Sequence, residues 1–317
     1  MDTKKYLITG GAGFIGSNLA KFILDKGHEV VVFDNFATGK RENIESLMDN
    51  PAFSLVEADL RDYDAVFNAL EGIDGVSHQG ALGSVPRSVA DPMTTHDVNV
   101  NGTINVLEAM RQQGVRRIVM ACSSSAYGRH KVSPKHEALT AAPISPYAAS
   151  KVACEAYLQG YSAVYDIEAI GLRYFNVFGP QQDPQGAYAA VIPRFVSALL
   201  KGEKPVVYGD GEQSRDFCYI DNVCSANWLA LNAPADRCDG LPMNIACNRR
   251  VSLNEILVKL QTLLGTDITA EYGPERAGDI KHSLASLDRA SEVIGYKPLV
   301  FFDEGLEKAI DWYKNNL

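Results

Sequence analysis

Short apolar runs that alternate with helical stretches restrict the fold of this chain more than any other feature. Apolar side chains occupy both faces of each run, as in strands that are buried on both sides. Because helices separate the runs, the pattern predicts an α/β fold with a Rossmann-type, doubly wound parallel sheet. The predicted strands are Tyr6–Thr9, Val30–Phe33, Phe53–Val56, Gly75–Ser77, Ile118–Cys122 and Ala169–Leu172.

The alternation ends after Arg173, where turn-rich stretches begin. They are Gly179–Gly186, Tyr208–Ser214 and Ala233–Pro242. We therefore expect two interleaved domains. Residues 1–175 form a dinucleotide-binding domain, to which part of 215–240 returns, and residues 176–317 form a smaller C-terminal α/β substrate domain. A length of 317 residues with 46% hydrophobic content suits one large core with a smaller companion.

The charge balance and the cysteines exclude several classes of protein. A formal net charge of −9 opposes binding along a nucleic-acid backbone, so no nucleic-acid partner is expected. No apolar run approaches the roughly 18 residues of a membrane span, and no signal peptide precedes the first predicted strand, so a cytoplasmic location is predicted. The six cysteines show no C-x-x-C pair and no histidine at ligand spacing, which indicates reduced, mostly buried thiols and no metal site.

A glycine-rich loop joins the first predicted strand to the helix that follows. Gly10, Gly13 and Gly16 are spaced G-x-x-G-x-x-G rather than G-x-G-x-x-G. We expect Gly10 to permit the turn, Gly13 to let the backbone approach a pyrophosphate, and Gly16 to let the helix pack closely on the sheet. For a glycine triplet alone, a tight turn with a small-residue packing contact is the alternative.

Two carboxylates follow strands at places where a dinucleotide is recognised. Asp34 ends the second predicted strand. A carboxylate there accepts hydrogen bonds from ribose hydroxyls and repels a 2′-phosphate, which favours NAD over NADP. Asp59 follows the third strand, where it can meet adenine; a helix N-cap before Arg61 and Asp62 is an equal alternative.

A tyrosine and a lysine one helical turn apart form the candidate catalytic centre. Ser145 and Pro146 predict a helix start, so Tyr147 and Lys151 share one helix face. Forming phenolate from a free tyrosine at pH 7 costs about 4 kcal/mol. Positive charges on Lys151 and on an oxidised nicotinamide offset a cost of that size, so Tyr147 is the expected base that oxidises a hydroxyl. A chance pair on an exposed helix is the alternative.

Ser123 ends the fifth predicted strand, at the edge of the sheet where ligands bind. Its hydroxyl can relay a proton between Tyr147 and a substrate hydroxyl. Any serine in such a run can instead be a turn residue bonded to the backbone, and for Ser124 and Ser125 that alternative stays open beside substrate contact.

These residues resemble the extended short-chain dehydrogenase/reductases and, within them, the NAD-dependent nucleotide-sugar 4-epimerases. The resemblance covers essentially the whole chain. It is strongest to bacterial enzymes that interconvert UDP-N-acetylglucosamine (UDP-GlcNAc) and UDP-N-acetylgalactosamine (UDP-GalNAc). The motifs that carry it are Gly83-Ser-Val-Pro-Arg-Ser88, Leu172-Arg-Tyr-Phe-Asn-Val-Phe-Gly179, Gln182-Asp-Pro184, Gly186-Ala-Tyr-Ala-Ala-Val-Ile-Pro193, Gly209-Asp-Gly-Glu212, Ser214-Arg-Asp-Phe-Cys-Tyr-Ile220, Arg276-x-Gly-Asp279 and His282-Ser-Leu-Ala285.

Three positions refine the resemblance. Gly80 stands where relatives usually carry alanine, which is expected to loosen the loop beside the nicotinamide. Ser124 and Ser125 stand where the sugar 4,6-dehydratases and decarboxylases of the family carry an acidic residue. Without that acid, elimination and decarboxylation lose their expected acid/base catalyst.

The resemblance implies the residues of three sites. Ser123, Tyr147 and Lys151 match the catalytic residues. The implied NAD contacts are Gly10, Gly13, Phe14, Ile15, Gly16, Asp34, Asn35, Gly39, Asp59, Leu60, Gln79, Ala81, Asn99, Tyr147, Lys151 and Tyr174. The implied UDP-sugar contacts are Gly83, Ser84, Ser123, Ser124, Ser125, Tyr147, Asn176, Ala190, Val191, Tyr208, Arg215, Arg276, Asp279 and Ser283. Arg215 and Arg276 match phosphate-binding arginines, with a surface ion pair as the alternative for each.

The implied activity is reversible C4 epimerisation through a 4-keto sugar, with NAD bound throughout and no net redox change. Ser283 matches a position that lines the acyl pocket, and its small side chain favours N-acetylated sugars. Epimerisation of UDP-glucose and UDP-galactose, or of UDP-glucuronate, is the alternative within the fold; the lack of an arginine near Gln182 and Asp183 disfavours the uronate. The alternative of a different class is a non-catalytic NAD-sensing binding protein.

Association follows from the same resemblance. Relatives pair the helices that carry Val98–Met110 and Val152–Tyr161 into a four-helix bundle, so a homodimer is expected.

Overall fold

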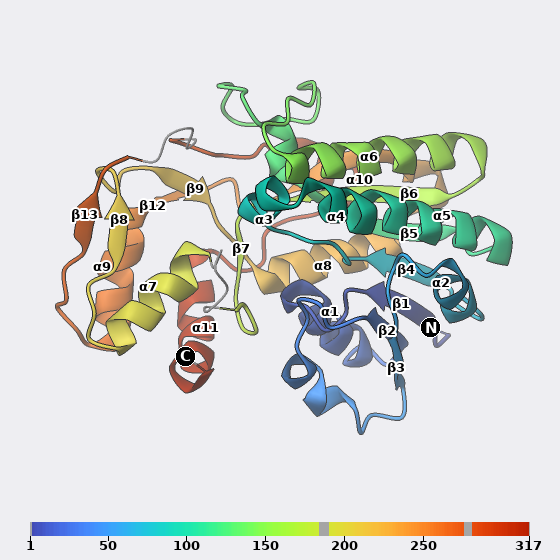
Figure 1. The fold of residues 1–317 in the computed structure, drawn as a ribbon, viewed down its shortest axis with the longest axis horizontal. Coiled ribbons are helices and arrows are strands. Elements are labelled where there is room, and N and C mark those ends of the chain that lie inside the picture. The colour runs from blue at the N-terminus through green and yellow to red at the C-terminus, as the bar shows by residue number, and fades with distance from the viewer. Residues whose placement is uncertain (1, 184–189, 276–280, 317) are drawn as a thin grey trace.

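A seven-stranded sheet forms the centre of the protein in a computed structural model, which describes residues 2–183, 190–275 and 281–316 (Figure 1). Neighbouring strands all run parallel, in the order β11-β6-β5-β4-β1-β2-β3. Their bounds are β1 (Lys5–Thr9), β2 (Glu29–Asp34), β3 (Phe53–Glu57), β4 (Gly75–His78), β5 (Arg117–Ser123), β6 (Glu168–Tyr174) and β11 (Asp239–Ile245). All six predicted strands are present, and the prediction of a doubly wound parallel sheet is confirmed.

Helices cover both faces of this sheet. One face packs against α1 (Phe14–Leu24) and α8 (Ile220–Leu231); the other packs against α2 (Tyr63–Ala69), α5 (Gly102–Gln113) and α6 (Pro146–Val164). Leu7 points into the apolar cluster on the second face, and its neighbour Ile8 points into the cluster on the first. Because both faces are covered, the strands are apolar on both sides, which produces the sequence pattern.

Short elements link β4 to α5. They are α3 (Val85–Ala90), α4 (Pro92–His96) and a wide π-helical turn, Asp97–Asn101.

All six cysteines are buried and unpaired, as predicted. Across the ranges that the structure describes, no helix combines the length and the apolar character that crossing a membrane requires.

The remaining chain builds three two-stranded sheets beside the large one (Figure 1). Two are parallel, β7 (Val177–Phe178) with β10 (Cys218–Tyr219) and β8 (Val206–Tyr208) with β13 (Glu271–Gly273); β9 (Ser214–Asp216) pairs antiparallel with β12 (Arg250–Ser252). The helices of this region are α7 (Val191–Leu200), α9 (Leu253–Leu264), α10 (Asp288–Ile294) and α11 (Phe302–Asn316). The expected division of the chain near residue 175 stays a prediction.

The seventh strand was hidden in a turn-rich sequence. The segment Ala233–Pro242 runs directly into β11, which pairs with β6 at the end of the sheet. Gly240 has a φ of 73°, and the pairing shifts register between Asp239 and Pro242. Glycine and proline therefore mark an irregular strand here rather than its absence.

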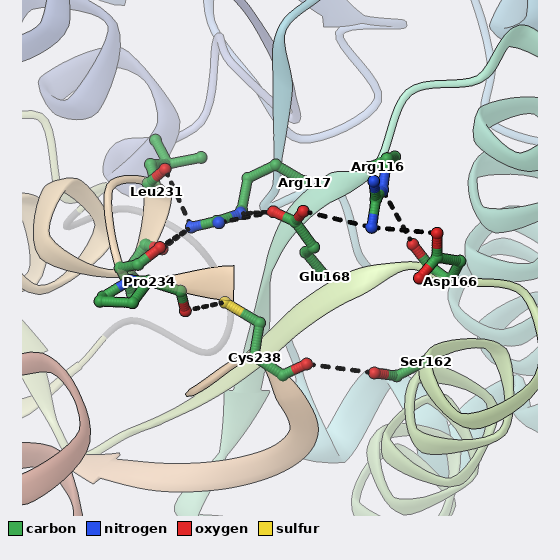
Figure 2. A network of polar contacts seen from close by, with 10 residues as sticks. Arg116, Arg117, Ser162, Asp166, Glu168, Leu231, Pro234 and Cys238 are labelled. Carbon is green, nitrogen blue, oxygen red and sulfur yellow. Dashed lines mark hydrogen bonds and ion pairs between the residues drawn. The ribbon is translucent and has the colours of Figure 1, made fainter. Parts of the chain in front are cut away.

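Arg117 fastens the end of α8 to the amino ends of β5 and β6 (Figure 2). Its Nη1 donates to three carbonyl oxygens, those of Ala230 at 3.1 Å, Leu231 at 3.2 Å and Ala233 at 2.8 Å. Its Nε and Nη2 donate to the Glu168 carboxylate at 3.0 and 2.6 Å. The side chain is 12% exposed, so water replaces few of these bonds when the arginine is lost.

Replacing Arg117 with alanine should therefore lower the free energy of unfolding by about 3 kcal/mol, because it leaves the three carbonyls without their donor and Glu168 with only the 3.6 Å ion pair to Arg116. The matched control is Arg116→Ala. Arg116 pairs with Asp166 at 3.0 Å, but its side chain is 54% exposed, so we expect a loss below about 1 kcal/mol. Urea unfolding of both variants measures the difference; equal losses would contradict the assignment.

Candidate active site

Two glycines bring three backbone segments together where β1 ends. Gly10 has a φ of 63°, and its N–H donates to the Phe33 carbonyl at 2.8 Å. A Cβ on Gly16 would lie 2.2 Å from the Gly10 oxygen, and a Cβ on Gly10 would lie 2.7 Å from the Cα of Gly80. The amino end of α1 therefore sits between β1 and β4, where the strand order reverses and where helix dipoles favour phosphate.

A cavity of about 510 Å³ follows this loop from β2 to α6, the helix that carries Tyr147 and Lys151. Most of the residues predicted to bind NAD line it: Gly10, Gly13, Phe14, Ile15, Gly16, Asp34, Asn35, Asp59, Leu60, Gln79, Ala81, Tyr147, Lys151 and Tyr174. Gly83, predicted for the substrate, lines it as well. A cavity lined by a glycine loop, by Asp34 and by Tyr147 and Lys151 fits a dinucleotide.

Asp34 is held rigidly at the end of β2. Its Oδ2 accepts the Ala12 N–H at 2.9 Å, and its Oδ1 accepts the Phe36 N–H at 2.8 Å. Burial raises the pKa of this carboxyl, and the two N–H donors counteract the rise. Each oxygen keeps a lone pair for a ribose hydroxyl. Gly39 lies outside the cavity lining, but a Cβ there would lie 2.9 Å from Oδ2, so this glycine leaves room for the carboxylate.

Asp59 is organised by its neighbours. Arg61 donates to it through Nε at 2.9 Å and Nη2 at 2.8 Å, and these bonds hold the pKa of the Asp59 carboxyl well below its usual range. Asn35 adds a bond at 2.7 Å. The alternative that Asp59 caps α2 is wrong, because Asp62 is the N-cap and accepts the Ala65 N–H at 3.1 Å.

A buried amide that the sequence did not single out orients two of the lining residues. The Asn227 Nδ2 in α8 donates to the Tyr174 hydroxyl at 2.8 Å, and its Oδ1 accepts from Gln79 Nε2 and Ser77 Oγ, each at 3.1 Å. The Tyr174 hydroxyl in turn donates to Gln79 Oε1 at 3.2 Å. This closed ring of hydrogen bonds fixes the Gln79 amide in the cavity wall. Only the fold brings α8 beneath β4, so no sequence spacing could have revealed it.

Asn99 lies behind the cavity wall rather than in it. Its Oδ1 accepts the Leu82 N–H at 2.7 Å, and its Nδ2 donates to Ser150 Oγ at 2.9 Å. Ser150 donates to the Tyr147 carbonyl at 2.8 Å. The Asn99 side chain links the loop after β4 to the first turn of α6, and its direct contact with NAD stays a prediction.

The catalytic helix begins as predicted. Ser145 is its N-cap and accepts the Ala148 N–H at 3.1 Å. Lys151 is buried, and its Nζ donates to the Ala121 carbonyl at 2.9 Å, which aims the ammonium at the end of β5. A buried ion pair between Glu155 and Arg173, with bonds of 2.7 and 2.9 Å, fastens the helix to β6.

The serine run forms a tight turn after β5. Ser123 Oγ accepts both the N–H of Ser125 at 3.2 Å and its hydroxyl hydrogen at 2.8 Å. With its oxygen occupied as an acceptor, the Ser123 hydroxyl is left to donate its own hydrogen. Ser124 opens the one-turn helix Ser124–Tyr127. None of the three serines belongs to the lining of the cavity beside Tyr147.

A second cavity, of about 270 Å³, lies in the smaller region. Five residues predicted to bind the UDP-sugar line it: Asn176, Ala190, Val191, Tyr208 and Arg215. Phe178 and Phe217 supply apolar wall, and Arg194 adds a second guanidinium. The Arg215 Nη1 donates to the carbonyls of Ser214 at 3.0 Å and Lys281 at 3.1 Å, which sets the direction of its side chain.

The other predicted substrate residues are more scattered. Ser84 caps α3 by accepting the Arg87 N–H at 3.2 Å. The Ser283 N–H donates to the Ser214 carbonyl at 3.0 Å, which places it beside the strand that carries Arg215. Arg276 and Asp279 lie outside the described residues.

Asp216 was missed by the sequence analysis, although it follows Arg215 directly. It is fully buried, and its two oxygens accept the N–H groups of Cys247 at 2.9 Å and Ala285 at 3.1 Å. Burial raises its pKa to about 6, and backbone donors oppose that rise. Asp216 thus joins β9 to two distant loops and steadies the backbone beneath Arg215.

Gly13 and Gly16 should respond differently to alanine. A Cβ at Gly16 would meet only backbone atoms, the Gly10 oxygen at 2.2 Å and the Gly11 Cα at 2.7 Å, so Gly16→Ala should displace α1 and lower both the melting temperature and the NAD content. At Gly13 the nearest atom is 3.2 Å away, so Gly13→Ala should lose NAD because its methyl meets the pyrophosphate, while the melting temperature of the NAD-free protein stays that of NAD-free wild type. Calorimetry and released NAD test this; equal melting losses would contradict it.

The comparisons with known proteins agree with this geometry. The model of the NAD dependent epimerase/dehydratase family matches residues 6–246. The UDP-glucose 4-epimerase of Mycolicibacterium smegmatis is 37% identical over 98% of both chains, and the UDP-glucuronate 4-epimerase of Thermodesulfobacterium geofontis is 32% identical over 98% of this chain and 97% of its own. The structure of UDP-N-acetylglucosamine 4-epimerase from Methanobrevibacter ruminantium M1, in complex with UDP-N-acetylmuramic acid, superimposes with a TM-score of 0.94 and 37% identity over all of both chains. Because the family model spans most of the sheet and the catalytic helix, this chain belongs to the NAD dependent epimerase/dehydratase family.

Proposed function

We propose that UDP-N-acetylhexosamines are the substrates of this NAD-dependent nucleotide-sugar 4-epimerase, which would interconvert UDP-GlcNAc and UDP-GalNAc. The observation that carries the proposal is the pairing of two cavities. One holds the dinucleotide residues together with Tyr147 and Lys151, and the other holds Asn176 and Arg215. A serine at 283 beside the strand of Arg215 supports an acetylated sugar.

The proton chemistry is assigned to three side chains. Tyr147, in its phenolate form, accepts the proton of the sugar 4-hydroxyl. The buried ammonium of Lys151 stabilises this phenolate before the proton is transferred. Ser123 donates its hydroxyl hydrogen towards the oxygen that loses the proton, because Ser125 already occupies its acceptor positions. When bound, NAD would accept the hydride from C4 of the sugar and return it in the second half of the reaction.

The second cavity supplies an anchor during that exchange. A ketohexose must turn over between the two halves of the reaction, while its diphosphate stays in place. Arg215 lines this cavity with a guanidinium, a group that pairs with phosphate oxygens, and the apolar wall of Phe178 and Phe217 offers a surface for a base. Neither Ser124 nor Ser125 can act as the acid or base of an elimination, which leaves epimerisation as the outcome.

We expect purified protein to convert UDP-GlcNAc into UDP-GalNAc without added NAD, because the cofactor returns to its starting state in each turnover. Tyr147→Phe should lower kcat by about 10²-fold to 10⁴-fold, since it removes the proton acceptor and keeps the ring. NMR of four UDP-hexoses and UDP-glucuronate, side by side, measures this. Tight NAD binding without any turnover would favour the NAD-sensing alternative, and equal turnover by Tyr147→Phe would contradict the assignment.

Ser283→Tyr is the control for substrate choice in the same assay. A bulky ring should reduce kcat/KM for the two acetylated sugars more than for UDP-glucose and UDP-galactose. UDP-glucuronate belongs in the panel because the UDP-glucuronate 4-epimerase of Thermodesulfobacterium geofontis is 32% identical to this chain. Equal losses on acetylated and plain sugars would refute the proposed role of Ser283.

We also propose a homodimer formed through α6. Its outward stripe carries small or apolar side chains and no charge: Ala149, Ala156, Tyr157, Gly160, Ala163 and Val164. Tyr157 is 43% and Val164 71% exposed, an arrangement that suits a helix pair.

Light scattering should give a mass of about 69 kDa, twice the 34.5 kDa of one chain. Tyr157→Glu should shift the protein to a monomer because it buries a charge in the helix pair. The control is Val258→Glu, a change at a 60% exposed apolar side chain of α9. A monomeric wild type would refute the proposal.

A further inference from the structure

Gln181, in the segment after β7, forms hydrogen bonds to residues that surround the glycine loop. Its Oε1 accepts the Asn18 Nδ2 hydrogen at 3.0 Å and lies 2.5 Å from Ser17 Oγ, whose one hydrogen it shares with the Gly13 carbonyl at 2.7 Å. Its Nε2 donates to the Asn43 carbonyl at 3.0 Å. A reversed amide would set its NH2 against that of Asn18 and its oxygen against the Asn43 carbonyl, so the orientation is fixed. Figure 1 shows the chain after β7 passing beside α1.

The partners of Gln181 belong to the shell around the glycine loop. The Ser17 N–H donates to the Gly13 carbonyl at 3.0 Å, and the Asn43 Nδ2 donates to the Ala12 carbonyl at 2.8 Å. Asn18 also donates to the Pro180 carbonyl at 3.1 Å. Gln181 therefore reaches the loop where the dinucleotide phosphates are expected, through a single layer of side chains.

The residues on either side of Gln181 form a wall of the second cavity. Asn176, Val177, Phe178 and Gln182 line it, and Gln182 Nε2 donates to the Val177 carbonyl at 3.0 Å. Beyond them, Asp183 pairs with Lys40 at 3.2 Å, and the Lys40 N–H donates to the Ala12 carbonyl at 3.0 Å. The residues on either side of Gln181 thus line the second cavity, while Gln181 itself contacts the residues around the glycine loop.

The backbone at Gln181 indicates that the side chain is required. Its φ of 69° lies in the left-handed region, which glycine tolerates and glutamine does not favour. A glutamine persists in that conformation because its three side-chain hydrogen bonds offset the strain.

We propose that Gln181 is a positioning residue that sets the wall of the second cavity against the cofactor loop. The proposal rests on the function proposed above, in which that cavity holds the UDP part of the substrate. Loss of the side chain then weakens UDP binding and raises KM, while the proton chemistry at Tyr147 continues.

Gln181→Gly is the sharpest test, because glycine accepts the left-handed backbone and removes only the hydrogen bonds. In the NAD-loaded protein, we expect the Kd for UDP by calorimetry and the KM for UDP-GlcNAc to rise about ten-fold, with kcat within about two-fold of wild type. Asn18→Ala approaches the same bonds from α1 and should weaken UDP binding in the same direction. The double variant should bind UDP little worse than Gln181→Gly, because both changes break one network.

The matched control is Asp166→Gly. Asp166 is another left-handed residue, with a φ of 58°, and lies just before the amino end of β6. The change should leave the Kd for UDP unchanged. A wild-type Kd in Gln181→Gly, or additive losses in the double variant, would overturn the proposal. Absence of epimerase turnover in the wild type would instead overturn the proposed function, whereas the calorimetric comparison still reports on Gln181.

Discussion

Backbone packed against backbone at the end of β1 is the constraint on which the other features depend. Gly16 rests on the Gly10 carbonyl, Gly10 rests on Gly80, and no side chain separates them. A Cβ on Gly80 would lie 2.7 Å from Leu60 Cδ1 and 3.2 Å from the Gly10 nitrogen, so the loop after β4 is closely packed at this glycine. Because Gly10, Gly16 and Gly80 have no side chains, the edge of the sheet between them stays open for a ligand.

A chain of buried hydrogen bonds supports that contact from below. Thr9 Oγ1 accepts the Gly80 N–H at 3.1 Å and bonds His78 Nδ1 at 2.7 Å, and His78 Nε2 bonds Thr103 Oγ1 at 3.0 Å. Thr103 donates its hydrogen to the Asn99 carbonyl at 2.6 Å, so His78 donates through Nε2 and accepts through Nδ1. Burial, with a smaller effect of a nearby lysine, lowers the pKa of His78 to about 3. The imidazole is therefore neutral near pH 7, and the direction of every bond in the chain is fixed.

The sequence could predict what is encoded within one element or one turn. The apolar runs, the glycine loop and the Ser145 cap all act over a few neighbouring residues, and each appears where it was expected. Contacts between distant elements left no such pattern. Asn227 meets Tyr174 only because α8 packs beneath the sheet, and Asp216 gathers loops that are more than thirty residues away. A carboxylate among acidic neighbours was equally ambiguous, since Asp59 and Asp62 compete for one helix start and only geometry decides between them.

The two cavities differ in how they are built, and this difference bears on the proposed reaction. The first is bounded by the ends of long parallel strands and by α6, which a buried ion pair holds to β6. The second is bounded by strands of two or three residues, by α7 and by the segment after β7. The proposed proton transfer needs Tyr147 fixed to within a fraction of an ångström of the bound ring, and a strand-backed helix provides that rigidity. A sugar that must turn over needs its anchor held while its ring stays free. In the proposed reaction Arg215, on a short strand whose backbone Asp216 fixes, would hold the diphosphate in the second cavity, outside the strand-backed layer that carries Tyr147.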